Sequence, residues 1–126
     1  LVDASGLSRQ NLISPQTLVK LLRAMSELSP SLADTYRQSL AQAGTTGTLT
    51  RRFVGTNLQG NLAAKTGTLT GVGALSGYLT MPQRETLVFS ILVNNSELEQ
   101  QEVRQAIDRV VALVAQFNLC GKSHDK

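Results

Sequence analysis

The sequence predicts an α/β protein of the α+β type, with an antiparallel sheet of at least three strands packed against helices. Three observations support this prediction. Apolar residues recur at helical spacing before residue 45, strand patterns fill residues 61–93, and helical spacing returns over residues 103–117. The last two strands are joined by a short turn, which favours antiparallel pairing. We therefore expect N-terminal helices and a long C-terminal helix packed on the sheet.

Length and composition indicate one globular unit. A chain of 126 residues fits a single domain of roughly 100–200 residues, and its 41% hydrophobic and 17% charged content is ordinary for a globular protein. The net charge of +3 is spread along the chain and tryptophan is absent, so no nucleic-acid partner is expected. No apolar run reaches about eighteen residues, so no transmembrane segment is expected. The lone Cys120 excludes an intrachain disulfide and offers no metal-ligand spacing.

Two helices are expected before residue 45. In "SPQTLVKLLRAMSEL", Ser14 suits the N-cap and Pro15 the first helical position. The apolar stripe of this helix consists of Leu18, Leu21, Leu22, Met25 and Leu28. A weaker helix follows "SPS" and ends at Gly44; its aligned apolar residues are Leu32, Tyr36 and Leu40. The next segment, "AGTTGTLT", is rich in Gly and Thr and is expected to be a loop.

Three strands are expected over residues 61–68, 74–81 and 86–93, with a turn at "PQRE" before the last. "TLVFSILV" is almost continuously apolar, which predicts a central strand with neighbours on both sides. Ser96 and Glu99 then have the spacing of a capping box. The long final helix carries a wide apolar face expected to lie on the sheet: Val103, Ala106, Ile107, Val110, Leu113, Val114 and Phe117. Residues 119–126 are expected to be a flexible tail.

Lys65 stands alone in "NLAAKTGTLTGVGALSGYLT", directly before Thr66 and Gly67. Lysine on a strand is most often an edge residue that blunts sheet-to-sheet pairing. Lys-Thr-Gly is also the third signature of the serine penicillin-recognising enzymes, where it lies on an edge strand followed by a hairpin. Such a site must hold a peptide carboxylate beside a nucleophile. Lys65 would supply a positive field, Thr66 a hydroxyl, Gly67 room for substrate backbone, and Thr68 a backbone N–H for the oxyanion.

The segment "VDASGLSRQNLISP" closely resembles the Asp-x-Ser-Gly-Leu-Ser-Arg-x-Asn block of the D-alanyl-D-alanine carboxypeptidase/endopeptidase family, the class C low-molecular-mass penicillin-binding proteins. In that family a helix, a "SLxxAGxxGTLxxR" segment and the Lys-Thr-Gly strand follow in this order, and "SLAQAGTTGTLTRR" lies between them here. The resemblance covers nearly the whole chain, to about Phe117. It implies the C-terminal part of a penicillin-binding domain, with the serine β-lactamase/penicillin-binding transpeptidase-like fold.

The resemblance also implies a substrate-binding wall beside the catalytic Lys65–Thr68 segment. Leu7 and Arg9 resemble residues that line the pocket for the peptide-stem side chain, and Leu69 and Thr70 continue that wall. A guanidinium fork suits a stem peptide with a free carboxylate; the alternative for Arg9 is a solvated arginine after a turn. Three polar side chains of the same block are expected to build the turn rather than take part in chemistry: Asp3, Ser5 and Asn11.

The two motifs that supply the nucleophile in this family are missing. No Ser-x-Asn occurs, and the only Ser-x-x-Lys is Ser123–Lys126, in a polar tail that also holds His124. A true motif opens a buried helix, so this match is a coincidence. The family places both motifs N-terminal to where this chain begins, and the chain opens on "LVDASGLS" without methionine. We therefore expect a chain that carries one wall of the site and is inactive alone.

The resemblance implies a parent serine-type D-Ala-D-Ala carboxypeptidase/endopeptidase that acts on peptidoglycan stem peptides through an acyl-enzyme. It would bind β-lactams, need no metal or organic cofactor, and work in the periplasm or elsewhere in the extracytoplasmic cell envelope. The alternative is a non-catalytic binding or interaction module with the same fold. The resemblance implies that the far side of strand 86–93 pairs with an N-terminal strand, so the isolated chain should self-associate, most simply as a homodimer through that edge or by exchange of an element.

Overall fold

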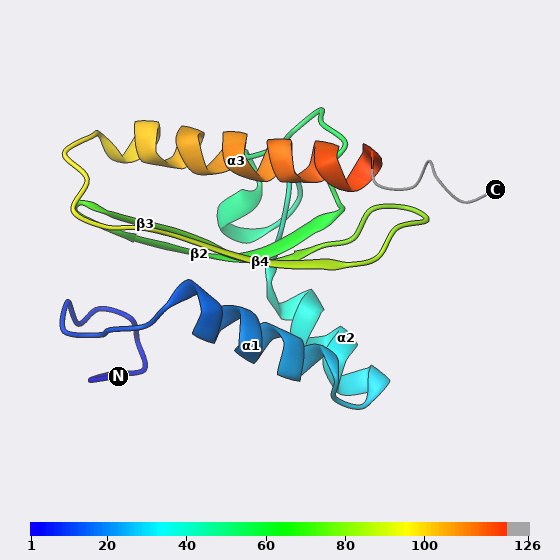
Figure 1. Ribbon diagram of the computed structural model, residues 1–126, viewed down its shortest axis with the longest axis horizontal. Coiled ribbons are helices and arrows are strands. Elements are labelled where there is room, and N and C mark those ends of the chain that lie inside the picture. The colour runs from blue at the N-terminus through cyan, green and yellow to red at the C-terminus, as the bar shows by residue number, and fades with distance from the viewer. Residues whose placement is uncertain (121–126) are drawn as a thin grey trace.

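The computed structural model describes residues 1–120, without the side chains of residues 118–120. The molecule has three layers (Figure 1). Helix α3 (Gln100–Cys120) runs along one face of a sheet, and helices α1 (Pro15–Ser26) and α2 (Pro30–Ser39) lie on the opposite face. The predicted class, with N-terminal helices and a long C-terminal helix on an antiparallel sheet, is confirmed.

The sheet contains four antiparallel strands in the order β1-β2-β3-β4. Their bounds are Ala41–Gln42 for β1, Leu62–Leu69 for β2, Val72–Leu79 for β3 and Leu87–Val93 for β4. The three longer strands lie close to the predicted ranges. The short β1 was not predicted, and it pairs only with Ala63 and Ala64. The strand that carries Lys65 is therefore a sheet edge only in its second half.

The prediction that the apolar run 86–93 forms a central strand is wrong for the described part of the chain, because β4 ends the sheet there. It pairs with β3, and all seven of its residues are half-buried. Helices cover both faces of β4: Phe89 packs into the core under α3, and Val88 packs against the core under α1. The continuous apolar run thus indicates that both faces of the strand are covered by helices, and it does not indicate a neighbouring strand on each side.

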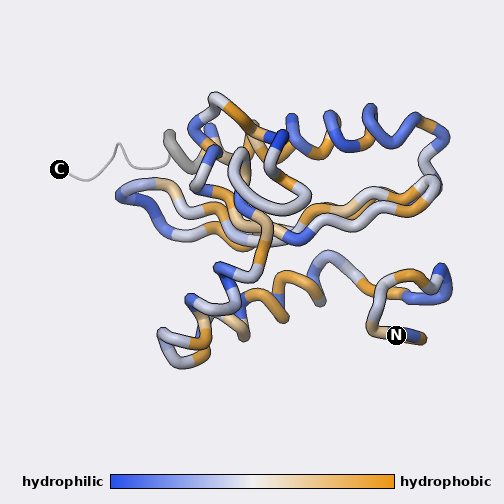
Figure 2. The backbone as a smooth tube through the Cα atoms, turned by 180° about the vertical axis from the view of Figure 1, so that it is seen from behind, coloured by the Kyte–Doolittle hydropathy of each residue, from blue (hydrophilic) through white to orange (hydrophobic). Residues whose placement is uncertain are grey.

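Two cores hold the layers together. The larger lies between the sheet and α3; its most deeply buried large side chains are Leu49, Leu58, Leu62, Leu75 and Leu79. The smaller lies under α1, where Leu22 and Leu40 surround Tyr78. The Tyr78 hydroxyl donates a hydrogen bond to the Leu22 carbonyl and so ties α1 to the sheet. Figure 2 shows the resulting pattern, with hydrophobic segments along the strands and hydrophilic outward turns in α3.

Helix α3 buries only part of its predicted apolar face. Val103, Ile107, Val111 and Ala115 follow at four-residue intervals and are buried against the sheet. The other residues of the predicted face are exposed: Ala106, Val110, Leu113, Val114 and Phe117. They lie on the flank of the helix next to the buried line, beyond the width that the described sheet covers. The prediction of one wide buried face is therefore wrong for this flank.

The start of α1 agrees with the prediction, whereas the start of α3 and the end of α2 differ from it. The Ser14 side chain accepts from the Thr17 N–H at 3.1 Å and Pro15 opens α1, as predicted. The predicted capping box at Ser96 is wrong, because α3 begins later, at Gln100. At this helix start the Glu99 N–H donates to Glu102 Oε2 at 3.1 Å. Helix α2 ends at Ser39, before Gly44, because the chain turns into β1.

The predicted tail lies largely outside the described residues. Helix α3 includes residues 119 and 120, which were assigned to that tail. The Ser123–Lys126 match and His124 fall among the residues that are not described.

Candidate functional site

The Lys-Thr-Gly segment lies on the half of β2 that has an open outer side. Strand β1 covers that side only as far as Ala64, so no described strand pairs there with residues 65–69. The Ala43 N–H donates to the Leu62 carbonyl at 2.9 Å, which shows that even-numbered residues of β2 direct their backbone groups outward. By the same alternation, Thr66 and Thr68 present N–H and C=O groups along the open edge. An extended peptide can pair with such an edge.

The side chains of this segment point to two different faces. Ala64 belongs to the core under α3, whereas Ala63 packs against the core under α1. Because side chains alternate along a strand, Thr66 and Thr68 face the α3 side and Lys65 faces the α1 side. The Lys65 ammonium donates to the Thr66 carbonyl at 2.8 Å. The positive charge is therefore held at the open edge.

Thr66 is tied to a residue that sequence reasoning missed. Its hydroxyl donates to the Thr48 hydroxyl at 2.9 Å. Thr48 lies in the short 3₁₀ helix η1 (Gly47–Leu49), inside the segment predicted as loop. Gly47 has φ 58°, and a Cβ there would come within 3.0 Å of the Ala41 side chain, so glycine lets η1 lie against β1. In the sequence, Thr48 could have been singled out because it lies in the "GTL" of the segment "SLAQAGTTGTLTRR", which precedes the Lys-Thr-Gly strand.

Gly67 leaves the α1 side of the edge open. A Cβ added at Gly67 would meet only the Ala74 side chain, at 3.2 Å. Other glycines of the sheet are packed against neighbours: a Cβ at Gly73 would lie 2.6 Å from Val103, and one at Gly77 would lie 2.1 Å from the Ala63 carbonyl oxygen. Gly67 is therefore the glycine of the site whose missing side chain faces open space rather than packed core.

The N-terminal block folds into a loop held by one carboxylate. Asp3 accepts from the backbone N–H groups of Gly6 at 2.9 Å and Ser8 at 2.8 Å, and from Asn11 Nδ2 at 3.0 Å. The pKa of Asp3 is held below its usual value mainly by the hydrogen bond from Asn11, and to a smaller extent by the hydrogen bond from the Gly6 N–H. The predicted turn-building role of these side chains is thus seen in their contacts.

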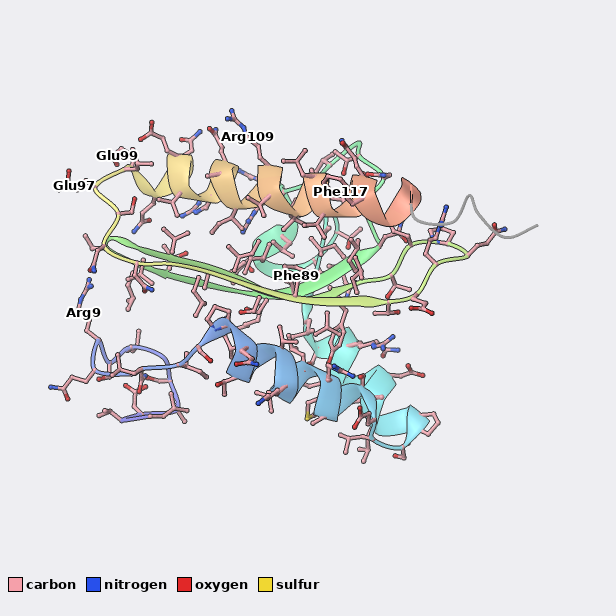
Figure 3. All side chains as sticks on the ribbon, in the orientation of Figure 1. Arg9, Phe89, Glu97, Glu99, Arg109 and Phe117 are labelled. Atoms are coloured by element: carbon pink, nitrogen blue, oxygen red, sulfur yellow. The ribbon has the colours of Figure 1, made fainter. Side chains whose placement is uncertain are left out.

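Arg9 reaches from this loop to the turn between β2 and β3 (Figure 3). Both terminal nitrogens of its guanidinium donate to the Thr70 carbonyl, each at 3.1 Å. The structure thus brings together two of the four residues predicted to bind substrate. Leu7 lies in the same loop, 72% exposed, with its N–H donated to the Ser5 hydroxyl at 3.3 Å. Leu69 ends β2 and is half-buried.

A polar groove of about 520 Å³ lies between the η1 segment and α3. Its walls are formed by Gly47, Thr48, Thr50, Arg51 and Arg52 on one side and by Gln101, Arg104, Gln105 and Asp108 on the other. Arg52 Nε donates to Asp108 Oδ2 at 3.2 Å, and a second, shorter contact completes the ion pair. Within the described residues, Arg51 and Arg104 have no ion pair. Sequence reasoning did not find this groove, because its arginines are far apart in the chain.

Residues 1–120 contain no group of three or more His, Cys, Asp or Glu side chains placed to hold a metal ion. In the same part of the chain, no helix is both long enough and apolar enough to span a bilayer.

The chain is similar in sequence to two carboxypeptidases. The chain is 36% identical over 123 residues to the penicillin-sensitive carboxypeptidase A of Dictyostelium discoideum, which covers 94% of this chain and 24% of that protein. It is 48% identical over 100 residues to the D-alanyl-D-alanine carboxypeptidase of an Actinomadura species, covering 75% of this chain and 18% of that protein. The chain therefore spans about a quarter or less of the length of these relatives.

Solved structures show the same fold. Penicillin binding protein 4 (dacB) of Haemophilus influenzae, complexed with a β-lactam, superposes with a TM-score of 0.78 at 28% identity, covering 89% of this chain and 28% of that one. Another structure of that protein gives a TM-score of 0.72 at 32% identity, covering 79% of this chain and 22% of that one. The profile of one peptidase family matches residues 1–115. The chain belongs to the D-Ala-D-Ala carboxypeptidase 3 (S13) family.

Proposed function

We propose that this chain forms the Lys-Thr-Gly wall of the active site in a serine-type D-Ala-D-Ala carboxypeptidase that acts on peptidoglycan stem peptides. The observation that supports the proposal is the open edge of β2, where Lys65 lies beside outward-facing backbone groups of Thr66 and Thr68. Membership of the family and relatives named as D-alanyl-D-alanine carboxypeptidases support the same function.

In the proposed reaction, the C-terminal end of a stem peptide pairs with the open edge. Lys65 attracts the terminal carboxylate, which Thr66 also contacts, and Gly67 admits the peptide backbone. The Thr68 N–H donates to the oxygen of the scissile carbonyl as negative charge develops there. A serine outside this chain attacks the carbonyl carbon, the C–N bond breaks, and D-alanine leaves after its nitrogen gains a proton. Water then cleaves the acyl-enzyme ester and restores the serine.

The second part of the proposal concerns the stem side chain. We assign its wall to Leu7, Arg9, Leu69 and Thr70. Leu69 and Thr70 lie at the β2–β3 turn, and Arg9 contacts this turn from the N-terminal loop that also carries Leu7. The contact between Arg9 and Thr70 supports this assignment, because it holds the guanidinium at the end of the open edge. Two of the five N–H donors of Arg9 are engaged there, so others remain for a carboxylate of the substrate.

The nucleophile is proposed to come from residues outside this sequence. The sequence has no Ser-x-Asn, and the relatives are about four times longer or more. The chain alone is therefore proposed to be inactive, and the full-length protein to act in the periplasm or another extracytoplasmic part of the cell envelope. Binding of β-lactams is proposed because a Haemophilus influenzae relative of this fold was solved with one bound.

Labelling with a fluorescent penicillin tests the proposal. We expect the full-length protein to form a covalent adduct, which survives denaturation, and the 126-residue chain to remain unlabelled. An unlabelled full-length protein would overturn the enzyme assignment and favour a non-catalytic interaction module. A labelled isolated chain would overturn the assignment of the nucleophile to another segment.

For the isolated chain we also propose a homodimer. The outer side of β4 has no described strand, and the half-buried residues of β4 leave apolar surface on that edge. The exposed flank of α3, with Val110, Val114 and Phe117, adds further apolar area. An open strand edge with apolar borders is a template for pairing with another chain.

A further inference from the structure

We propose that the groove between η1 and α3 binds a side-chain carboxylate of an acidic peptide whose backbone pairs with the open edge of β2. This inference rests on the proposed function, since it takes the open edge to be the peptide site. It adds a second anion-binding wall, on the opposite side of the sheet from Arg9.

The groove presents positive charge that the described chain does not neutralise. Three arginines and one aspartate line it, and Asp108 is already paired with Arg52. Arg51 and Arg104 have no ion pair in residues 1–120, and they line the groove from the η1 side and from α3. Guanidinium groups on two walls of one groove suit a planar carboxylate, which accepts hydrogen bonds on both oxygens.

The groove is built from a regular stripe of α3. Gln101, Arg104, Gln105 and Asp108 have the spacing of one helical face, and this face is turned toward the η1 segment. The Arg52–Asp108 ion pair fixes one end of the groove, with side chains only 15% and 26% exposed. The site therefore has a rigid frame with two further arginines free of ion pairs within the described part of the chain.

The groove is joined to the peptide edge through one hydrogen bond. Thr48 lines the groove, and its hydroxyl accepts from Thr66, on the open half of β2. Thr66 and Thr68 point to the α3 side of the sheet, where the groove lies. Arg104 also lines a small cavity with Gly67 and Thr68, which places this arginine along the same stretch of β2.

Alternation along the bound peptide then divides its side chains between two walls. A peptide paired with β2 sends successive side chains to opposite faces of the sheet. The side chains of every second residue point to the Arg9 loop, on the α1 side. The side chains of the residues between them point to the groove with Arg51 and Arg104. An acidic residue should therefore strengthen binding through the groove only at alternate positions.

The test is a scan of fluorescent peptides that end in a single D-alanine, so that no D-Ala-D-Ala bond remains to be cleaved. One Glu replaces Gln at each of three successive positions before that residue, and fluorescence anisotropy gives the Kd for the full-length protein. We expect tighter binding of a Glu peptide at alternate positions, by about 1.5- to 5-fold for partly exposed pairs. At positions whose side chains point to the groove, this preference should depend on Arg51 and Arg104. In the Arg51→Gln, Arg104→Gln double variant, the Kd values of the Glu and Gln peptides at these positions should become nearly equal.

Arg109→Gln is the matched control, because Arg109 carries the same charge on the same helix but points away from the sheet (Figure 3). A Glu preference that survives loss of Arg51 and Arg104, or that Arg109→Gln reduces equally, would overturn the proposal. So would undetectable binding of every peptide. Binding of inorganic phosphate that depends on these arginines, without any Glu preference, would assign the groove to a phosphate ligand instead. Since the readout is binding, the absence of any Glu preference in the parent protein, when penicillin still labels that protein, overturns this inference and leaves the proposed function intact.

Discussion

The guanidinium of Arg9 and the backbone carbonyl of Thr70 are joined by two hydrogen bonds of 3.1 Å across 61 residues of sequence. This contact attaches the N-terminal loop to the turn that ends the open edge of β2. The loop is itself ordered by the Asp3 carboxylate, which accepts three hydrogen bonds. The backbone of the N-terminal loop and the backbone of the β2–β3 turn are therefore held together at this point.

Arg9→Ala should weaken turnover of stem peptides with a free carboxylate on the diamino acid more than it weakens acylation by penicillin. The reason is that most penicillins carry no group that matches this carboxylate. Arg9→Lys is the control, since it keeps the charge and loses the planar fork. The kcat/KM for such a peptide and the rate of penicillin acylation should be measured together. Equal losses for both ligands would show that Arg9 acts only through the loop structure.

Tyr78→Phe should lower the free energy of unfolding by about 0.5–1.5 kcal/mol at neutral pH, because the hydrogen bond to the Leu22 carbonyl is lost. Burial, with a smaller effect of Tyr36, raises the pKa of the Tyr78 hydroxyl, against an opposing effect of Arg37. Above pH of about 10 the unfolded state therefore ionises first, and this contribution to stability declines. In urea unfolding, the difference between Tyr78→Phe and the parent should shrink as pH rises past that value; a growing difference would contradict the account.

Gly67→Ala and Gly77→Ala should separate function from folding. A methyl group at Gly67 meets one side chain at 3.2 Å, so the cost in stability should be about 1 kcal/mol or less. It would nevertheless obstruct the substrate backbone, and acylation should fall by about 10²-fold. At Gly77 the same methyl lies 2.1 Å from a backbone oxygen and should destabilise by about 1–3 kcal/mol or more. Thermal unfolding and penicillin acylation of both variants check this; a large loss of stability in Gly67→Ala would refute it.

The isolated chain should elute as a dimer or larger species in size exclusion coupled to light scattering. Phe117→Lys replaces an exposed apolar side chain of the α3 flank by a charge and should shift the chain toward monomer. Leu12→Lys, at an exposed position of the N-terminal loop, is the control and should leave the distribution unchanged. A stable monomer at all concentrations would show that β4 and the α3 flank do not mediate self-association.

Local signals predicted the elements well. Ser14 and Pro15 mark the start of α1 because a capping side chain and a fixed φ act within one turn of the helix. The three long strands follow from their apolar patterns. The edge position of Lys65 also emerged from the motif, although β1 covers part of the same strand.

Features set by distant segments could not be predicted from the sequence. The apolar run of β4 records cover by α1 and α3, so it says nothing about the number of strand neighbours. The face of α3 that is buried depends on the width of the sheet below it, which leaves Val110 and Phe117 exposed. The hydrogen bond between Thr48 and Thr66 and the groove beside it depend on how η1 packs against α3.

The acylation rate of the Lys65→Ala variant tests the central claim most directly. Lys65 is exposed, and its described hydrogen bond is to the neighbouring Thr66 carbonyl, so its removal should leave the fold intact. The second-order rate constant for acylation of the full-length protein by penicillin should be measured by stopped-flow fluorescence, with circular dichroism as the check on folding. We expect this rate constant to fall by about 10²–10³-fold while the circular dichroism spectrum stays unchanged. Acylation at the rate of the parent protein would contradict the assignment of this edge to the active site.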